Sequence, residues 1–510
     1  MADKKTKIEE VPLKDKGKEE KCDKRKTFVE KIWHVLSNIT VEPIFFGLVI
    51  PSMLARLAEQ NLNLDKACRV KLQYGDAVCD ALIEKKGNHS FEEVEVQKVI
   101  SAIESWKSVI QTALPSILVI VMGAWSDRTG NRKLCILLPL FGALFVCLSN
   151  LISTIFFHTI SVEVTMFLEA IFPAITGGWV MIFLGIFSYI TDITTEECRT
   201  FRVGVANLCL TAGIPIGSAL SGILLKWLGY YGIFIISTLI YIITILYGIV
   251  YLESNTKPKN NSDEKIKSLT CTDLKTLVKE TAMVALKKRD GNNRLKIILT
   301  LIVVAIIYGP DQGERIISYM YVRHRLKWDA LKYSFYSTYS IIIHTLSALF
   351  SISVFSKRLG FHDSMLCLIS VTSKLIGTIY VAFVYTDIQM FLVPIAEILN
   401  ATTFTSLRSM ISKLVPNEEA GKMNSLFSLV ETLAALVFNP IYSILYMKTI
   451  NVFSGTVFLF SSIFTIFAIF ILIWIFKCHR QETRQKRLED AEMRTLDEKD
   501  KESTLPRLTD

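Results

Sequence analysis

Long apolar segments alternate with short polar segments along most of this sequence. Twelve apolar runs are long enough to cross a membrane, and they fall at residues 39–57, 106–125, 134–156, 164–190, 203–225, 230–252, 295–321, 333–355, 364–384, 390–411, 423–447 and 452–476. A membrane-spanning helix needs about 20 mostly apolar residues. The pattern therefore predicts an all-α membrane protein with twelve transmembrane helices. The seventh run is the least regular, because the polar sequence GPDQGER interrupts it.

Polar segments divide these spans into two six-helix halves. The expected organisation is a disordered cytosolic tail at 1–38, an N-terminal half at 39–252 with an extracellular loop at 58–105, a cytosolic linker at 253–294, a C-terminal half at 295–476, and a disordered cytosolic tail at 477–510. Two halves joined by a linker are typical of transporters built from repeats. A gene fusion or a long loop would give the same hydropathy pattern.

The distribution of charge agrees with a membrane protein. The 510-residue chain is 51% hydrophobic, with a mean hydropathy of +0.39 and a net charge of +9. Its basic residues gather in the tails, the linker and alternate loops, whereas the short loops 157–162 and 385–388 contain no Lys or Arg. This positive-inside pattern predicts that both termini are cytosolic. This distribution of basic residues does not indicate a nucleic-acid-binding surface. The composition excludes disordered, collagen-like and soluble multidomain proteins.

Two covalent features are expected in the extracellular loop. Cys68 and Cys79 are the two cysteines assigned to the outside, so we predict a disulfide between them. Asn88, followed by His89 and Ser90, forms a glycosylation sequon in the same loop.

The segment GAWSDRTGNRK, residues 123–133, joins the second and third spans. Gly130 gives a tight turn its backbone freedom, and Asp127 at a helix end can meet the N-terminus of a neighbouring helix. Basic side chains of this loop can bridge acidic groups across the half. The expected cytosolic gate includes Asp127, Arg128, Gly130 and Arg132.

This segment resembles the signature G-x-x-x-D-R-x-G-R-R of the major facilitator superfamily, with Asn131 replacing the first basic residue of the final pair. The resemblance to this superfamily adds Gly123, Asp192 and Arg199 to the expected gate. Several phrases are also similar to solute carrier family 46, the group of the proton-coupled folate transporter. They are TVEP at 40–43, GAWSD at 123–127, RTFR at 199–202, KWD at 327–329 and LRSMISKLVPNEEAGKMNSLFS at 407–428. The resemblance implies a major-facilitator-type fold and a carrier that moves an organic-anion-type solute together with protons.

The resemblance also bears on individual residues. It implies a role in substrate or proton handling for Arg408, and it places Asn207 where the folate carrier has a glutamate. The family's arginine and aspartate of the fourth span are replaced by small or apolar residues around 170–178, and Lys327 stands where the family has an external cysteine. Folate is therefore a poor candidate substrate.

Ionisable residues inside the spans give evidence independent of that resemblance. They are Asp311, Glu314, Arg315, His344, Lys374, Glu397 and Glu431. A charge at the centre of a bilayer costs several kcal/mol, so such residues normally face a bundle interior or a watery cavity. We hypothesise that Glu397 or Glu431 exchanges the coupling proton, while Arg408 and Arg315 attract an anionic substrate.

Structural roles compete with this hypothesis at several positions. The acidic and basic residues of the seventh span can form a satisfied local cluster, and His344 can be a packing histidine. Lys374 is expected to snorkel or to form a structural pair. Glu42 and Glu169 lie towards span ends, where they are expected to be solvated. Glu397 and Arg408 are expected to share one helix face about three turns apart.

These observations favour a secondary active transporter that imports a polar or anionic organic solute with protons. No nucleotide-binding loop, metalloprotease pair, zinc-type cysteine spacing or serine-hydrolase elbow occurs, so no enzyme activity, cofactor or metal is expected. The alternatives are a channel and a non-transporting sensor or scaffold. We expect the protein to act as a monomer among membrane lipids, without nucleic acid, at the plasma membrane or alternatively in a lysosomal or endosomal membrane.

Overall fold

The computed structural model describes residues 40–87, 89–194, 196–253, 287, 292–351, 354, 358 and 362–503. Within these ranges the chain is almost entirely helical and forms no β-strand. The predicted glycosylation site at Asn88, the N-terminal tail and nearly all of the linker lie outside the described residues.

The N-terminal half is formed by α2 (Glu42–Lys66), η1 (Ala67–Lys71), α3 (Asp76–Glu84), α4 (Ser90–Thr129), α5 (Arg132–Ile155), α6 (Val162–Thr176), α7 (Gly178–Ile193) and α8 (Glu196–Tyr251). Glycines in unusual backbone conformations break two of its long apolar stretches. Gly177, with φ 83°, separates α6 from α7. Gly229 has φ 62° and ψ −165° and divides α8 into two helices.

The C-terminal half is formed by α10 (Asn293–Arg325), α11 (Ala330–Ser351), α12 (Asp363–Ala382), α13 (Asp387–Ala396), η3 (Asn400–Thr402), α14 (Thr403–Lys413), α15 (Asn417–Thr449) and α16 (Thr456–Ser503). The polar sequence GPDQGER does not interrupt α10. Gly309 and Gly313 instead lie against Phe438 and Tyr442 of α15, where an added Cβ would come within 2.2 and 2.3 Å of their rings. The two glycines therefore allow α10 and α15 to approach closely.

Eight helical segments of the described chain are long and apolar enough to cross a membrane, and the bent pair α13–α14 makes a ninth. The chain is a multi-pass membrane protein. One of the eight segments is most of α8, whose 56 residues would extend about 84 Å if straight, against about 30 Å for the hydrocarbon core of a bilayer. The break at Gly229 is what makes its length compatible with a membrane.

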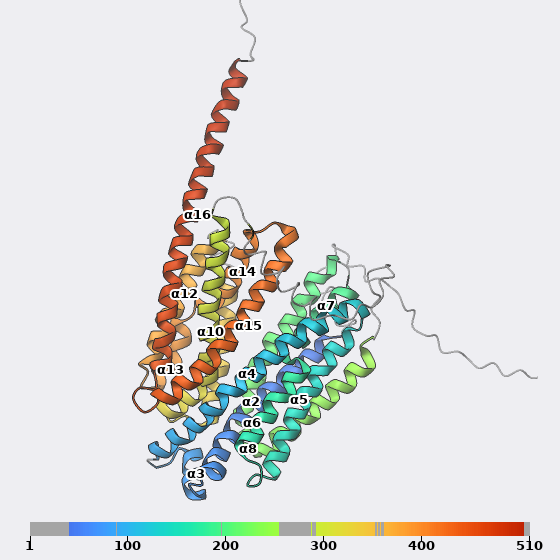
Figure 1. Ribbon diagram of the computed structural model, residues 1–510, viewed down its shortest axis with the longest axis vertical. Coiled ribbons are helices and arrows are strands. Elements are labelled where there is room, and N and C mark those ends of the chain that lie inside the picture. The colour runs from blue at the N-terminus through green and yellow to red at the C-terminus, as the bar shows by residue number, and fades with distance from the viewer. Residues whose placement is uncertain are drawn as a thin grey trace, which may run out of the picture.

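The two halves share an apolar core at one end of the molecule. One buried cluster combines residues of α2, α4 and the Cys68–Cys79 region with Tyr319, Trp328 and Tyr446 of the C-terminal half. Two other clusters are each confined to one half. In Figure 1 the end that carries α3 is where the halves meet, and the C-terminal part of α16 extends beyond the opposite end. The halves are therefore joined most firmly at the α3 end.

Two predicted segments differ from the structure. The segment 58–105 is largely helical, because α2 continues to Lys66 and α4 begins at Ser90. The segment after residue 476 also differs from the predicted disordered tail, since α16 continues to Ser503. Its Glu, Lys and Arg residues are good helix formers, and oppositely charged pairs three or four residues apart support a helix.

The predicted disulfide is confirmed. Cys68 in η1 and Cys79 in α3 are bonded, with Cα atoms 5.9 Å apart. Both residues are buried at the α3 end. The bond therefore ties the short helix α3 to the end of α2.

Cys68→Ser should lower the free energy of unfolding by about 2 to 3 kcal/mol, because the closed loop no longer restricts the unfolded chain. Thermal melting of the purified protein would measure the loss, and Cys79→Ser should reproduce it without adding to it in the double variant. Cys478→Ser, at a free cysteine, should melt as the unchanged protein does. Additive losses in the double variant would contradict a role for the bond.

Candidate functional site

A single lysine gathers three carboxylates inside the C-terminal half. Lys374 Nζ on α12 lies 2.8 Å from Glu314, 3.4 Å from Asp311 and 3.7 Å from Glu397. All four side chains are only about a tenth exposed. Lys374 thus forms a structural pair, one of the two roles expected for it. The structure brings together four of the ionisable residues that the sequence singled out, and we call these four side chains the Lys374 cluster.

The position of Glu397 depends on a break in the predicted tenth span. Glu397 follows α13 directly as its C-terminal cap, and the chain then bends by 45° before α14. Its side chain lies over Gly377 of α12, where an added Cβ would come within 1.9 Å of Glu397 Cγ. The expectation that Glu397 and Arg408 share one face of a continuous helix is therefore wrong.

The charges of the Lys374 cluster are not balanced. Arg315 Nε binds Asp311 at 2.9 Å, and its side chain remains 65% exposed. Three carboxylates against Lys374 and Arg315 leave one negative charge if all are ionised (−3 + 2 = −1). Glu314 Oε1 is buried and has no hydrogen-bond partner among the described residues. Uptake of one proton would neutralise the group.

A second pair lies on the neighbouring helices α14 and α15. Arg408 binds Glu431 at 3.0 Å, and its guanidinium lies 4.7 Å from the centre of the Phe427 ring. The Arg408 side chain is 49% exposed, whereas Glu431 is 16% exposed. Tyr308 of α10 lies within electrostatic range both of this pair and of Asp311. The Tyr308 hydroxyl group therefore lies near both charged groups.

The remaining predicted residues are placed differently. His344 on α11 lies near Lys374, Arg315 and Asp311, but it forms no side-chain hydrogen bond to another described residue. Asn207 on α8 is exposed and is not brought to either charged group. Its backbone carbonyl accepts a hydrogen bond from Thr211, and that contact belongs to the helix.

A second buried charge cluster occupies the N-terminal half and was missed from the sequence. Lys107 on α4 lies 2.7 Å from Glu169 on α6 and 3.6 Å from Glu104. Asn63 donates to both carboxylate oxygens of Glu169 at 3.1 Å, and Glu59 lies nearby on α2. Glu169 is 2% exposed, so its expected solvation is wrong. The i, i+3 spacing of Glu104 and Lys107 was the available signal.

Glu42 is also buried rather than solvated. Its side chain is 5% exposed and lies 3.3 Å from Arg202 of α8. The pair ties the start of α2 to the N-terminal part of α8.

The loop between α4 and α5 contains part of the predicted gate. Gly130 ends α4 with φ 68°, and Arg132 Nε binds Asp192 of α7 at 2.9 Å. This pair links the start of α5 to the end of α7. The side chains of Asp127 and Arg128 lie outside the described part, and Gly123 packs against Leu184. Arg199 is half-buried, with its Nε unpaired among the described side chains.

Polar contacts between the halves gather at the α3 end. Arg323, at the end of α10, binds Glu93 of α4 at 2.8 Å and donates to Asn61 of α2 at 3.3 Å. Tyr319 also donates to Asn61, at 2.7 Å, and Tyr446 donates to Gln97 at 2.8 Å. These contacts close this end of the molecule together with the shared apolar core.

Glu93 remains ionised in this setting. It lies in the first turn of α4, outside the predicted membrane span, and is 6% exposed. Burial opposes its ionisation, but the charges of Arg323 and Lys85 outweigh that effect and lower the pKa of Glu93 to about 2. The contact between the halves therefore persists across the pH range of cellular compartments.

Within the described residues, no group of three or more His, Cys, Asp or Glu side chains is arranged to hold a metal ion. The acidic residues of the Lys374 cluster surround an ammonium group instead. A group with excess negative charge of this kind can accept a proton.

Comparison with known proteins identifies the fold. The model of the Major Facilitator Superfamily matches residues 97–439 and 316–506. The chain belongs to the major facilitator superfamily. Several transporters are similar in sequence to this superfamily member over most of its length. A Drosophila melanogaster protein named "Probable peptidoglycan muropeptide transporter SLC46" is 21% identical over 443 residues, covering 86% of this chain and 84% of the relative.

Two vertebrate relatives give the same result. The Gallus gallus "Lysosomal proton-coupled steroid conjugate and bile acid symporter SLC46A3" is 24% identical over 446 residues, 86% of this chain and 94% of the relative. The Rattus norvegicus "Proton-coupled folate transporter" is 25% identical over 380 residues, 74% of this chain and 79% of the relative. These matches confirm the resemblance to solute carrier family 46. This member of the superfamily is accordingly related to transporters and is not an enzyme.

Solved structures of the superfamily share the fold. The human organic anion transporter MFSD10 has a TM-score of 0.55 at 16% identity, covering 85% of this chain and 98% of that chain. A POT family transporter in complex with a thioalcohol-conjugated peptide has a TM-score of 0.55 at 13% identity, covering 86% and 96%.

Lys374→Gln should destabilise the superfamily member by about 3 to 5 kcal/mol, because the buried carboxylates lose their central cation. The double variant Lys374→Gln/Glu314→Gln should recover part of that loss, since its net charge returns to −1. Thermal melting of detergent-solubilised protein would measure both, with Lys448→Gln at an exposed site as the control. Equal melting temperatures for the single and double variants would contradict the ion cluster.

Glu93→Gln should lower the melting temperature by the same amount at about pH 7.5 and about pH 5.5. A carboxylate with its pKa lowered from 4.5 to about 2 stabilises the fold above pH 4.5 and loses that effect as the pH falls towards 2. The gap between Glu93→Gln and the unchanged protein should therefore shrink only below about pH 4.5. Glu84→Gln, at an exposed pair with Lys86, is the control and should change little. If the difference in melting temperature between Glu93→Gln and the unchanged protein disappeared between about pH 7.5 and about pH 5.5, the ion pair of Glu93 with Arg323 would not be stable over this range.

Proposed function

We propose that this protein is a secondary active transporter that moves a polar or anionic organic solute together with protons by alternating access. The observation that carries the proposal is the Lys374 cluster, a buried group inside an apolar helical bundle that keeps one excess negative charge even when Arg315 is counted with it. A proton-coupled carrier needs a group of this kind, because the bound proton must change the energy of a conformational step.

Twelve spans with both termini in the cytosol fit the arrangement of the helices. In the N-terminal half, α2, α4, α5, the pair α6–α7 and the two parts of α8 supply six crossings. In the C-terminal half, α10, α11, α12, the broken α13–α14, α15 and α16 supply six more. The positions of the basic segments favour a cytosolic location for the linker and for the end of α16.

The exposed arginines favour an anionic substrate. Arg315 and Arg408 are 65% and 49% exposed although both lie within predicted spans. Contact of a guanidinium with lipid is costly, so we place both side chains at a water-filled passage between the halves. Their carboxylate partners hold them there, and a substrate carboxylate, sulfate or phosphate could bind the free donors of either guanidinium.

Alternating access explains why the halves are joined at one end. The shared core and the polar contacts around Arg323 close the α3 end, which we assign to the side away from the cytosol. Transport requires these contacts to separate and the opposite end to close. The relatives act on muropeptides, on steroid conjugates and bile acids, and on folate by their names, so the substrate search begins with organic anions of these classes at the plasma membrane or an endolysosomal membrane.

Uptake into proteoliposomes at about pH 5.5 and about pH 7.5 would test the proposal. The screen includes pteridines, conjugated steroids, bile acids and peptidoglycan fragments. A transported substrate should enter faster at the lower pH, and Glu397→Gln or Glu431→Gln should abolish the acid stimulation. Glu163→Gln, at an exposed pair with Lys71, should retain it.

Unchanged acid stimulation in both Glu397→Gln and Glu431→Gln would end the proton-coupling proposal. Saturable counterflow of the same substrate would separate a carrier from a channel, since a channel shows none. Binding without flux would indicate a sensor.

A further inference from the structure

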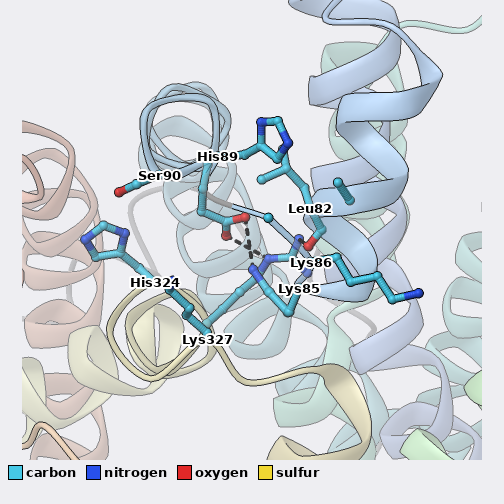
Figure 2. Close-up of a pocket in the computed structure, with 11 residues that line it drawn as sticks. Leu82, Lys85, Lys86, His89, Ser90, His324 and Lys327 are labelled. Atoms are coloured by element: carbon cyan, nitrogen blue, oxygen red, sulfur yellow. Dashed lines mark hydrogen bonds and ion pairs between the residues drawn. The ribbon is translucent and has the colours of Figure 1, made fainter.

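A basic pocket opens between the halves at the α3 end, apart from the charged groups within the spans. One wall consists of Lys85, Lys86 and His89 from the turn between α3 and α4. The other consists of Arg323 and His324 in the last turn of α10 and Lys327 just after it. Figure 2 shows the labelled side chains of Lys85, Lys86, His89, His324 and Lys327 that line this pocket. Glu93 accepts hydrogen bonds from Lys85 at 3.0 Å and from Arg323 at 2.8 Å.

The positive charge of the pocket exceeds what its single carboxylate can neutralise. Lys85, Arg323 and Lys327 carry three positive charges against the one negative charge of Glu93 (+3 − 1 = +2). Lys86 forms an exposed ion pair with Glu84, and His89 lies 3.7 Å from Glu92, so each of these two residues has a carboxylate partner of its own. Two of the cations are withdrawn from water, since the side chains of Lys85 and Arg323 are 12% and 4% exposed.

Both walls hold a lysine in a strained backbone conformation. Lys85 has φ 56° and Lys327 has φ 54°, and Gln73 is the one other non-glycine residue with positive φ in the described part of the chain. A left-handed conformation costs a side-chain-bearing residue on the order of 1 kcal/mol or more. Glycine would relieve that cost, as at many helix C-termini. Strained residues of this kind gather at functional sites, where the side chain is needed.

The N-terminus of a long helix adds further positive potential. Ser90, the first residue of α4, lines the pocket. His89 precedes it without donating or accepting a capping side-chain hydrogen bond. Backbone N–H groups at a helix N-terminus bind phosphate and carboxylate groups well, and nearby lysines strengthen that preference.

We infer that this pocket binds an oxyanion, a carboxylate or phosphate group, that bridges the two halves and stabilises the conformation closed at the α3 end. Because each half supplies cations, separation of the halves divides the site. The anion therefore favours the closed conformation. Burial and then the charge of Arg323 lower the pKa of Lys85 to about 8, and a nearby oxyanion would favour its charged form. This inference does not depend on the transported solute or on proton coupling.

Melting of the full-length protein in detergent, with sodium phosphate or sodium citrate added, tests the site. Sodium chloride at matched ionic strength is the reference. The melting temperature should rise and saturate with phosphate or citrate and not with chloride. Comparison of the two salts separates a phosphate site from a carboxylate site.

Lys85→Asn and Lys327→Asn remove one cation from each half, and asparagine tolerates the left-handed conformation. Each should weaken the apparent affinity for the anion at least about tenfold, a loss of about 1.4 kcal/mol. Lys71→Asn, at an exposed lysine paired with Glu163, should leave the affinity unchanged. Lys327 is exposed, so its variant is expected to fold even if Lys85→Asn does not.

A rise with chloride equal to that with phosphate and citrate would overturn the site. Unchanged affinity in both variants would also overturn it. A loss confined to the variant of one half would refute the bridging of the two halves.

Discussion

The energetic cost of burying charge is the constraint on which this structure depends. Lys374 lies among three carboxylates in the middle of an apolar bundle, and none of these groups would be tolerated there alone. The cluster links α10 and α12 to the break after α13, so the broken helix and the close packing over Gly377 belong to the same arrangement. Counted with Arg315, this group carries one excess negative charge while it stabilises the fold. The same group can therefore accept a proton.

A similar charge balance recurs in the N-terminal half. Glu59, Glu104 and Glu169 surround Lys107, and Arg56 lies near Glu59. Three carboxylates and two cations therefore occur in each half, although the central lysines lie on different crossings, Lys107 on α4 and Lys374 on α12. Among the described residues, the ion pair between Arg323 and Glu93 joins the two halves, and both residues line the basic pocket.

The sequence predicted the fold and part of the site. Hydropathy and the glycine-rich loop were sufficient for the all-helical superfamily fold, and the topology was sufficient for the Cys68–Cys79 bond. The charged residues of the seventh span could be found because each interrupts an apolar run. The buried ion pair between Glu169 and Lys107 was harder to recognise, because both residues lie near the ends of predicted spans. At a span end, a solvated charge and a buried ion pair give the same hydropathy pattern. Glu93 and Arg323 pair over a separation of 230 residues, and only the packing of the halves brings them together. Pro394 lies near the break at Glu397 and is a sequence signal for it. The packing of Glu397 against Gly377 is a tertiary contact, which the sequence does not reveal.

The central claim is that the Lys374 cluster takes up a proton without losing its place in the fold. Infrared difference spectroscopy of the purified protein between about pH 7.5 and about pH 5.5 observes protonation of carboxyl groups directly and needs no substrate. The account predicts a protonated-carboxyl band that appears at the lower pH and is absent from Glu397→Gln or from Glu314→Gln. An identical band in the unchanged protein and in both variants, or no band at all, would contradict it.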